Sequence, residues 1–508
     1  MKVYPPSDMR KADSYAIEAL GIPGKILMDN AAGALFESLF DHIGKGKKFL
    51  ILCGKGNNGG DGYALALKLS DAFENVVCLS VFGSAPKTED ALYFYELCKS
   101  RKIPIINCES DFDLSIEKIA DADVITDAIF GTGFSGEIQS ASICAKIIEL
   151  SNSSLAYRLS ADIPSGIDAE YGSASAISFC AHKTLSFSKG KPGMYSYGAR
   201  ELCGEIQIAD IGIPDSVFEN FNTKYETSDD NLLLSSLPKR YKNSSKGSYG
   251  RLLVIAGSKD MPGAAHLACL GALRMGAGLV CLASEQSVID TVKYRLSEPV
   301  YLPVSDTDKD TKKLIEYANS CSAVLIGCGL GKSEKSTGRI FKLIQNITAP
   351  IILDADGINA ISGNINVLSE AKCDIILTPH PLEFSRISGL PVSEIQQNRI
   401  KCALDFSEKF GCTLLLKGAG TVIARCGERV IINTSGNSAL SKGGSGDVLT
   451  GMIASLSAQG TAPDDAAICG AYLHGLAGDT LSGELSEYGV LPSEIPERAA
   501  KILAEILK

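Results

Sequence analysis

The stretch FLILCGKGNNGGDGYALALKLS, residues 49–70, has the pattern of a buried strand, a glycine-rich turn and a helix. Three of its glycines, Gly54, Gly56 and Gly59, have the G-x-G-x-x-G spacing of dinucleotide-binding loops. However, the next apolar run, VVCLSVFG, ends without the acidic residue that would bind a ribose hydroxyl. Asp61 also lies inside the loop, where a carboxylate would repel phosphate but could cap the helix, bind a hydroxyl or support a cation. The stretch therefore predicts an open α/β sheet, but not an ordinary Rossmann dinucleotide site.

Similar apolar runs alternate with helix-like segments along the whole chain of 508 residues. Continuous apolar strands separated by periodic helices are typical of parallel sheets covered by helices on both faces. The segment 214–246 is the poorest in strand signal and is rich in Asn, Ser and Asp. We therefore expect two α/β domains, residues 1–220 and 246–508, joined by a linker at 221–245. The expected strands lie at 49–54, 76–83, 123–131, 156–162, 251–258, 279–284, 323–329, 350–357, 374–380, 413–420 and 428–434.

The composition excludes several classes of function. Hydrophobic residues make up 45% of the chain, which is enough for a folded core. The formal net charge of −10 argues against a nucleic-acid partner, because that affinity depends largely on clustered Lys and Arg. The chain has neither an apolar run of about 18 residues nor an apolar leader, so we expect no membrane partner and a cytoplasmic location. The 16 cysteines form no C-x-x-C pair, and we expect buried, reduced thiols.

Two further strand ends in the first half carry acidic and hydroxyl side chains. Asp127 interrupts the apolar run VITDAIF, and Asp162 and Ser165 follow the run RLSA. A buried acid is costly unless it is paired, caps a helix or ligates a metal. In open α/β sheets ligands bind beyond the carboxyl ends of the strands, so these side chains are expected to converge with Asn58 on one crevice. Asn58, Asp127 and Ser165 offer only oxygen ligands, which favours a hard cation.

Three motifs of this half, GKGNNGGDG, DAIFGTGFSG and DIPSGID, together resemble the NAD(P)H-hydrate epimerase family over roughly residues 1–215. We expect a Rossmann-like doubly wound sheet. The resemblance implies that Asn58, Asp127 and Ser165 hold a potassium ion and that Asp162 is the candidate base beside the nicotinamide. The same fold is a non-catalytic module in some mRNA-decapping scaffold proteins, but the presence of Asp127 and Asp162 favours an enzyme. Contacts with the hydrated dinucleotide are implied for Asn57, Asn58, Gly59, Gly60, Asp61, Gly131, Thr132, Gly133, Phe134, Ser135, Gly136, Glu137 and Asp162.

In the second half, the stretch NTSGNSALSKGGSGDVLTGMIASLSAQG, residues 433–460, predicts a glycine-rich turn followed by a helix that begins near Asp447. A helix N-terminus presents free N–H groups and a partial positive charge, so this turn can hold phosphate oxygens. Asp447 itself has two interpretations, an N-cap that contributes about 1 kcal/mol or a functional carboxylate. The glycines Gly443, Gly444 and Gly446 favour function, because an ordinary cap does not need such open access to the backbone.

The GGSGD motif resembles the anion hole and catalytic Asp of the ribokinase-like superfamily, with Ser445 in place of the usual Thr. The motifs GCGLGKS, ILDADGINAI, LTPHPLEF and LLLKGAGTVI follow in the order of its NAD(P)H-hydrate dehydratase branch, over about residues 235–508. The resemblance implies a ribokinase-like α/β domain in which Asp447 takes the proton from a substrate hydroxyl during phosphoryl transfer. Contacts with the hydrated cofactor are implied for Ala265, Gly329, His380 and Asp447, and contacts with a nucleotide for Lys417, Gly418, Ala419, Gly420, Thr421 and Gly446.

Together the two resemblances imply a bifunctional enzyme that repairs hydrated NAD(P)H, by epimerising its R and S forms and by dehydrating the S form with ADP or ATP. They imply K⁺ and Mg²⁺ as cofactors, the hydrated cofactor and an adenine nucleotide as partners, and we expect a homo-oligomer. Asp354 and Asp356 follow a strand and either support Mg²⁺ through water or cap a helix. The alternatives are a ribokinase-class small-molecule kinase with a regulatory N-terminal domain, and a non-enzymatic scaffold. A kinase would accumulate a phosphorylated substrate, whereas a dehydratase would release inorganic phosphate.

Overall fold

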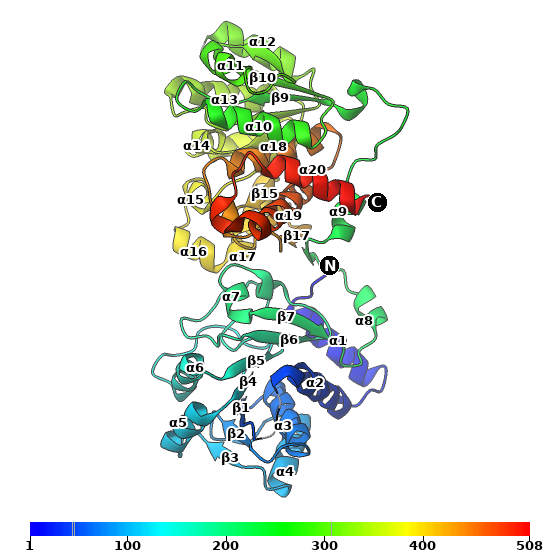
Figure 1. Cartoon of the computed structure of the whole chain (residues 1–508), viewed down its shortest axis with the longest axis vertical. Helices are drawn as coiled ribbons and strands as arrows, with labels where there is room; N and C mark the ends of the chain where they lie inside the picture. The colour runs from blue at the N-terminus through cyan, green and yellow to red at the C-terminus, as the bar shows by residue number, and fades with distance from the viewer. Residues whose placement is uncertain (43, 45, 306) are drawn as a thin grey trace. The chain divides into compact units, whose positions relative to one another are not determined.

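The chain folds as two compact units in the computed structural model, which describes residues 1–42, 44, 46–305 and 307–508. One unit comprises Lys2–Tyr225, and the other comprises Met1 and Glu226–Lys508 (Figure 1). The division falls inside the segment 221–245 that the sequence suggests as a linker. Part of that segment is regular structure, since it contains strand β8 and helix α9.

The N-terminal unit contains a seven-stranded sheet with the order β3-β2-β1-β4-β5-β6-β7. Its pairings are all parallel, and the order reverses between β1 and β4, as in a doubly wound Rossmann-like sheet. The strands are β1 (Phe49–Cys53), β2 (Val76–Ser80), β3 (Ile105–Asn107), β4 (Val124–Ala128), β5 (Tyr157–Ala161), β6 (Lys183–Phe187) and β7 (Glu205–Ala209). The helices are α1 (Pro6–Glu18), α2 (Gly24–Ser38), α3 (Asn57–Ser70), α4 (Glu89–Ser100), α5 (Phe112–Asp121), α6 (Ile143–Ser153), α7 (Ala199–Cys203) and α8 (Asp215–Glu219), with 3-10 turns η1 (Phe40–His42) and η2 (Pro192–Tyr195).

Helices cover both faces of this sheet. Ile51 of β1 belongs to a buried cluster that includes α1 to α4, whereas the next residue, Leu52, belongs to a cluster that includes α5 and α6. Successive side chains of a strand point to opposite faces, so β1 reads as a continuous apolar run. Helix α3 packs tightly on the sheet, because a Cβ on Gly62 would lie 2.8 Å from the Cβ of Ala128.

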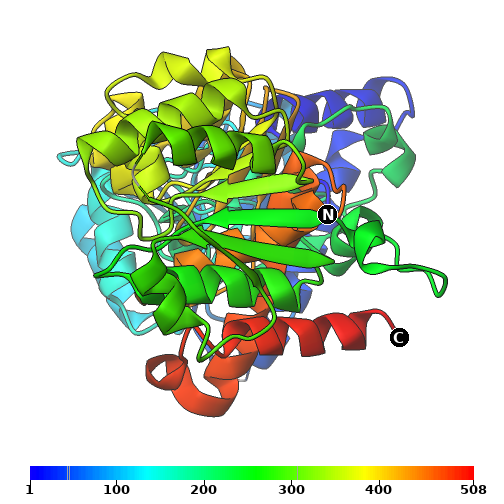
Figure 2. The same ribbon diagram turned by 90° about the horizontal axis from the view of Figure 1, so that it is seen from above.

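The C-terminal unit contains a ten-stranded sheet with the order β11-β10-β9-β12-β13-β14-β15-β16-β17-β8. The strands from β11 to β15 are parallel, whereas β16 pairs antiparallel with β15 and β17. Figure 2 shows strands of this unit side by side with helices on both faces. The strands are β8 (Tyr225–Thr227), β9 (Arg251–Ile255), β10 (Leu279–Ser284), β11 (Val300–Pro303), β12 (Ala323–Ile326), β13 (Ile351–Leu353), β14 (Ile375–Leu377), β15 (Thr413–Leu416), β16 (Val422–Arg425) and β17 (Arg429–Ile432). The helices are α9 (Asp230–Ser236), α10 (Pro262–Arg274), α11 (Gln286–Val292), α12 (Asp308–Ala318), α13 (Glu334–Asn346), α14 (Asp356–Ile361), α15 (Pro381–Ser388), α16 (Val392–Gln397), α17 (Arg399–Phe410), α18 (Ser445–Ala458), α19 (Pro463–Gly489) and α20 (Ile495–Ile506), with 3-10 turns η3 (Lys246–Tyr249), η4 (Ile365–Glu370) and η5 (Ser438–Leu440).

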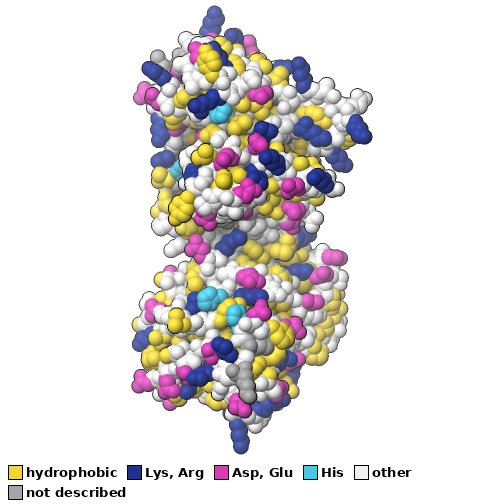
Figure 3. Space-filling view, viewed as in Figure 1, with side chains coloured by type: hydrophobic (Ala, Val, Ile, Leu, Met, Phe, Trp, Pro, Cys, Tyr) yellow, Lys and Arg dark blue, Asp and Glu magenta, His cyan; other side chains and the backbone are white. Residues whose placement is uncertain are grey.

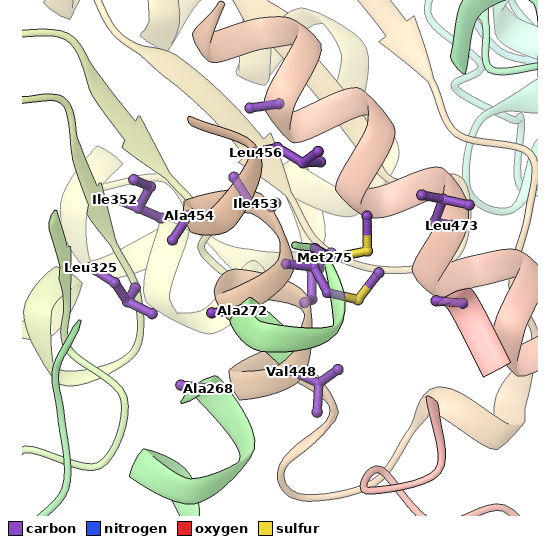
Figure 4. Packing of buried hydrophobic residues seen from close by; sticks show 14 of the residues in the cluster. Ala268, Ala272, Met275, Leu325, Ile352, Val448, Ile453, Ala454, Leu456 and Leu473 are labelled. Carbon is purple, nitrogen blue, oxygen red and sulfur yellow. The ribbon is translucent and has the colours of Figure 1, made fainter. Parts of the chain in front are cut away.

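Helices α10, α18, α19 and α20 pack around one large buried cluster of this unit. Figure 4 shows Ala268 and Ala272 of α10 beside Val448 and other apolar side chains of α18. The two helices approach closely because α18 carries a glycine at their contact. A Cβ on Gly451 would lie 2.1 Å from the carbonyl oxygen of Ala268. The core therefore fixes the position of α18, and with it the glycine-rich turn at its start.

The predicted α/β class and the two-domain architecture are confirmed, and each expected strand is present. Six strands lay outside the prediction: β3, β6, β7, β8, β11 and β16. Most cysteines are buried, but Cys426 is exposed. Within the described residues, every helix is too short or too polar to cross a membrane. On the face shown in Figure 3, acidic and basic side chains are interspersed over each unit.

Candidate functional site

The glycine-rich turn after β1 lies where the strand order of the N-terminal sheet reverses. Open α/β sheets bind their ligands at this point. Gly54 must be glycine, since a Cβ there would lie 1.9 Å from the carbonyl oxygen of Ile129, just after β4. In the first turn of α3, a Cβ on Gly59 would lie 2.0 Å from the carbonyl oxygen of Gly54. These glycines therefore place the start of α3 directly against two strand ends.

Asp127 of β4 is the centre of a buried polar cluster at this point. Its Oδ1 accepts hydrogen bonds from Ser165 Oγ at 2.7 Å and the Ile129 amide at 3.2 Å, and its Oδ2 accepts the Ser165 amide at 2.8 Å. Burial raises the pKa of the Asp127 carboxyl to about 6, although the bonds from Ser165 oppose the rise. Asn58 Nδ2 donates to the Phe130 carbonyl at 2.9 Å, while the Phe130 amide donates to Ser165 Oγ at 2.9 Å. The fold thus brings the three predicted cation ligands together.

Asn58 carries the observation that favours a cation here. Its Oδ1 is buried and has no hydrogen-bond partner among the described residues. A buried oxygen without a partner costs about 1–3 kcal/mol, so a ligand at this position would remove that cost. Asn58, Asp127 and Ser165 offer oxygen atoms alone, which suits a hard cation such as K⁺. The donor set therefore fits the predicted ion.

A cavity of about 520 Å³ opens beside this cluster. The predicted dinucleotide contacts that line it are Asn57, Asn58, Asp61, Gly131, Thr132, Gly133, Phe134 and Asp162. Five others, Gly59, Gly60, Ser135, Gly136 and Glu137, are not part of its wall. Gly60 instead packs into the protein interior, where a Cβ would lie 2.7 Å from the Cβ of Ala91. The cavity therefore brings together most of the predicted binding residues, but not all of them.

Asp162 directly follows β5 and has a φ of +68°, which is unusual for a residue other than glycine. Lys191, just before η2, donates a hydrogen bond to Asp162 Oδ1. The same ammonium donates to Ser186 Oγ at 2.8 Å and to the Phe187 carbonyl at 3.0 Å. Lys191 is only 1% exposed, so Asp162 balances a charge that water does not reach. Lys191 was not among the predicted site residues, although the glycine-marked run SKGKPG that contains it follows strand β6.

Three more carboxyl groups face the same cavity, those of Asp13 of α1, Asp61 of α3 and Asp90 of α4. Burial, followed by the charges of Asp162 and Asp13, raises the pKa of Asp61 well above its usual range. Burial and Asp162 also raise the pKa of Asp13, to about 6, although Lys191 opposes this rise. The cavity thus combines four carboxyl groups with one buried ammonium.

In the C-terminal unit, α18 begins in the glycine-rich turn, two residues before Asp447. Gly444 has a φ of +100°, which glycine adopts without strain. His474 of α19 contacts the Ser445 carbonyl through Nε2 at 3.1 Å and so holds the turn. Four backbone amides of the turn donate to no acceptor in the described chain, and free amides at a helix start can bind an anion. They are the amides of Gly443, Gly444, Gly446 and Asp447.

Asp447 is half-buried beside Cys328 and Asp354. The thiol sulfur and one oxygen of each carboxylate lie within 4.8 Å of one another. Burial, followed by the charge of Asp354, raises the pKa of Asp447 to about 6, while the neighbouring Cys328 thiol and the charge of Lys417 oppose the rise. Burial and the two carboxylates raise the pKa of the Cys328 thiol well above its usual range, so it stays protonated. At neutral pH, Asp447 is therefore an ionised group that can accept a proton.

Asp354 is 1% exposed and is bound by side chains from three elements. Its Oδ1 accepts Lys417 Nζ at 2.7 Å and Thr378 Oγ1 at 2.8 Å, and its Oδ2 accepts Thr450 Oγ1 at 2.9 Å. Burial lowers the pKa of the Lys417 ammonium, but the adjacent Asp354 outweighs it, so the pKa is raised. Lys417 is therefore a permanent positive charge in this pocket.

The described side chains around Asp447 do not fit a resident magnesium ion. Mg²⁺ takes oxygen ligands, whereas Cys328 offers a protonated thiol. Asp354 binds Lys417 and Thr450 through its two oxygens. Asp356 accepts the Gly331 amide at 2.8 Å and so holds the loop after β12. The two acids thus bind other parts of the protein, and Mg²⁺ stays a prediction.

The predicted nucleotide loop, residues 417–421, connects β15 to β16. Arg399 is fully buried beneath it and donates to the carbonyls of Leu416 at 2.7 Å and Lys417 at 2.9 Å. A Cβ on Gly418 would lie 3.0 Å from the guanidinium nitrogens of Arg399, so a side chain there would crowd the arginine. Thr421 Oγ1 donates to the Gly418 carbonyl at 2.8 Å and closes the loop on itself.

The remaining predicted contacts lie around the same sheet edge. His380 caps α15, where its Nδ1 accepts the Glu383 amide at 3.3 Å, and its side chain is 45% exposed. Gly329 has a φ of +64°, and a Cβ there would lie 2.7 Å from the Cβ of Ala264. Ala265 is fully buried, so its methyl group packs in the core and only its backbone is left for a ligand.

The folds and sites define a two-domain enzyme that joins a Rossmann-like unit to a ribokinase-like unit. The family model described as NAD(P)H-hydrate dehydratase matches residues 252–501, and the model described as YjeF-related protein N-terminus matches residues 24–193. A bifunctional NAD(P)H-hydrate repair enzyme of Moorella thermoacetica is 32% identical over 502 residues, covering 96% of this chain and 94% of the relative. The chain therefore belongs to the family of bifunctional NAD(P)H-hydrate repair enzymes.

Solved structures also match more than half of the chain. A ribokinase-like superfamily protein of Enterococcus faecalis is 26% identical to this chain, with a TM-score of 0.50. The match covers 56% of this chain and 98% of that protein's chain. An ADP/ATP-dependent NAD(P)H-hydrate dehydratase of Bacillus subtilis, co-crystallised with ATP and Mg²⁺, is 33% identical to this chain, with a TM-score of 0.49. The match covers 55% of this chain and 98% of that protein's chain. The first of these likenesses supports the ribokinase-like fold.

Proposed function

We propose that this chain repairs hydrated NAD(P)H through two reactions, one in each unit. The N-terminal unit interconverts the R and S epimers, and the C-terminal unit dehydrates the S epimer with an adenine nucleotide as phosphoryl donor. The observation that carries the proposal is Asp447 beside free backbone amides at the start of α18. This arrangement supplies a proton acceptor and an anion site at the same point.

The chemistry of the substrate explains why both are needed. Hydrated NAD(P)H carries a hydroxyl on ring carbon 6, next to the ring nitrogen, and hydroxide is a poor leaving group near neutral pH. Asp447 accepts the hydroxyl proton as the oxygen attacks the terminal phosphoryl group, whose charge the amides of the turn stabilise. The nitrogen lone pair then expels phosphate, and loss of a proton from carbon 5 regenerates NAD(P)H. We favour ADP as the donor, which becomes AMP; ATP would become ADP.

Lys417 supports the placement of the phosphoryl group. A Cβ on Gly446 would lie 3.3 Å from Lys417 Nζ, so the ammonium lies directly beside the free amides. Asp354 holds this ammonium in place at 2.7 Å. Lys417 begins the loop 417–421. Arg399 lies beneath this loop and donates hydrogen bonds to the carbonyls of Leu416 and Lys417. The nucleotide phosphates therefore have a charged and amide-lined position next to Asp447.

In the N-terminal unit, Asn58, Asp127 and Ser165 would hold K⁺. When bound, the ion supplies fixed positive charge beside the phosphates of the dinucleotide. Asp162 is the proposed proton acceptor for epimerisation, because it lines the cavity and Lys191 holds its Oδ1. Proton transfer by one well-placed side chain is worth about 10²–10⁴-fold in rate.

The test is to incubate the full chain with each hydrate epimer, with and without ADP or ATP, and to resolve both epimers by chromatography. Without nucleotide, the R epimer should convert to an R and S mixture faster than in an enzyme-free control. With nucleotide, both epimers should disappear, with equal amounts of NAD(P)H and inorganic phosphate formed. A phosphorylated substrate that accumulates without NAD(P)H would identify a kinase and overturn the dehydratase. An R epimer that converts no faster than the control would overturn the epimerase.

A further inference from the structure

The cavity of the N-terminal unit contains more proton-transfer groups than the one base already assigned to it. Asp13, Asp61, Asp162 and Lys191 come from four different elements and line the same wall. The other charged side chains on this wall are Arg10, Lys55 and Asp90. Epimerisation at a carbon that carries both a hydroxyl and a nitrogen needs a proton donor as well as an acceptor. The surroundings of Asp162 and Asp61 differ in the way that such a pair requires.

Lys191 fixes one side of the Asp162 carboxylate. Its three N–H groups are all used, by Asp162 Oδ1, Ser186 Oγ and the Phe187 carbonyl. Asp162 Oδ1 also accepts the Phe187 amide at 3.2 Å. In the described chain no donor reaches Asp162 Oδ2. One oxygen is therefore anchored by a buried cation, and the other is left for a substrate proton.

Asp61 has the opposite surroundings. Its carboxyl has no ion pair and no hydrogen bond with any described residue. Its charged neighbours are the acids Asp162 and Asp13, which together with burial raise its pKa well above the usual range. Asp13 differs from Asp61, because Lys191 is near it and its pKa rises only to about 6. Asp61 is thus the acid of this cavity whose surroundings most favour the protonated form.

We propose that Lys191 is a positioning residue that holds Asp162 as the proton acceptor, and that Asp61, which lines the same cavity, is the proton donor of epimerisation. This inference rests on the proposed epimerase function of the unit. It assigns to Asp61 a chemical role in addition to the ligand contact expected from its place in the glycine-rich turn.

The two groups together allow a balanced ring-opening step. Asp162 accepts the hydroxyl proton, the C6–O bond becomes a carbonyl as the C6–N1 bond breaks, and N1 takes the proton of Asp61. Rotation about the C5–C6 bond then presents the opposite face of the aldehyde to N1. On closure, N1 returns its proton to Asp61 and the oxygen regains its proton from Asp162. The S epimer forms with no atom or electron gained or lost.

The experiment measures conversion of the purified R hydrate of NADH to the S hydrate by the full chain without nucleotide, across a range of pH. Asp61→Asn should lower kcat by about 10²–10⁴-fold with little change in KM, because amide nitrogen cannot donate the proton. The kcat of the wild-type enzyme is expected to fall as pH rises and Asp61 ionises. In Asp61→Asn this fall should be absent. Asp71→Asn is the matched control, since it makes the same chemical change at the opposite end of α3, outside the cavity wall, and its kcat should equal that of the wild type.

Two substitutions of Lys191, one that removes its positive charge and one that keeps it, test whether this charge is needed. Lys191→Met should lower kcat by about 10²-fold or more with KM nearly unchanged, and Lys191→Arg should restore at least a tenth of the wild-type kcat. Thermal unfolding of each variant identifies any that fail to fold, in which case Asp61→Asn decides the matter. An Asp61→Asn enzyme with wild-type kcat, or a Lys191→Arg enzyme as slow as Lys191→Met, overturns the inference. A wild-type enzyme that fails to epimerise overturns the proposed function instead.

Discussion

The two pockets differ in what their buried lysine contacts. In the N-terminal unit, Lys191 binds Asp162, the proposed proton acceptor itself. In the C-terminal unit, Lys417 binds Asp354 at 2.7 Å, and Asp447 keeps a pKa raised to about 6. The difference matches the two reactions: epimerisation transfers no phosphoryl group, whereas dehydration must bind the anionic phosphoryl group beside Lys417. Both sites contain an acid, and they differ in which acid the buried lysine contacts.

The two pockets also share a device, a glycine that brings a helix start close to its support. Gly59 places the start of α3 against the end of β1, and Gly451 places α18 against α10. Side chains at these positions would overlap backbone carbonyl oxygens at 2.0 Å and 2.1 Å. In both units, the position of the catalytic loop thus depends on close packing a few residues away.

Asp447→Asn should give the largest effect and should affect only one of the two activities. Nucleotide-dependent dehydration of the S hydrate is expected to fall by about 10²–10⁴-fold, because the amide cannot accept the hydroxyl proton. Epimerisation of the R hydrate, measured on the same preparation, should be unchanged. Loss of both activities would break the comparison, because the two sites would then not act independently.

Gly451→Ala tests whether packing of α18 on α10 supports the dehydratase site. The added methyl overlaps the Ala268 carbonyl oxygen, so the C-terminal unit should lose about 1–3 kcal/mol of unfolding free energy in urea titration. Gly338→Ala is the control, since a Cβ at this helical position in α13 meets no atom within 4 Å. It should raise stability by about 0.5–1 kcal/mol. Equal stability of the two variants would contradict the packing argument.

Replacement of potassium by lithium should affect only the N-terminal unit. Li⁺ is smaller than K⁺ and should be held less well by oxygen ligands that fit K⁺, so epimerisation should slow by about tenfold. Dehydration of the S hydrate should keep its rate in the same buffer, because the proposed ion lies in the other unit. Rates in matched potassium and lithium chloride provide the measurement, and equal epimerisation in both salts would remove the ion from the account.

The smallest expected effect concerns the pH dependence of dehydration. Asp447 must be ionised to act, and its pKa is about 6, so kcat should fall as pH drops below 6. The neighbouring Cys328 thiol lowers the pKa of Asp447, so Cys328→Ala should raise it and move this fall to higher pH, by less than about one unit. Epimerisation should keep its own profile. A shift to lower pH, or none, would show that the thiol does not contact the carboxylate in solution.

The parts of the molecule with a local sequence pattern could be predicted. The apolar runs gave the central strands, and the spacing after Asp447 gave α18 to within two residues of its start. Strands β7 and β11 could not be found in this way, because they lie near sheet edges and alternate or expose their residues. Central strand β6 was missed for another reason: its Lys, Thr and Ser are polar, and two of them are buried only because carbonyl groups accept their hydroxyls.

The site residues divide in the same manner. Asp127, Asp162 and Asp447 stand out because an acid at a strand end or a glycine turn conflicts with its apolar neighbours. Lys191 and Asp13 become site residues only through the fold, which brings them to Asp162 from distant parts of the chain. The residues next to them in the sequence do not mark them as site residues. Contacts made between separate elements are therefore the part of a site that local sequence does not reveal.

The fate of the substrate oxygen tests most directly whether dehydration passes through a phosphate ester. S hydrate labelled with ¹⁸O at its carbon 6 hydroxyl would be incubated briefly with the enzyme and ADP, and the released phosphate analysed by mass spectrometry. If Asp447 directs phosphorylation of that hydroxyl, the ¹⁸O atom leaves within inorganic phosphate. If the label appears in water and the phosphate is unlabelled, the hydroxyl leaves without being phosphorylated, and the proposed role of the α18 turn is wrong.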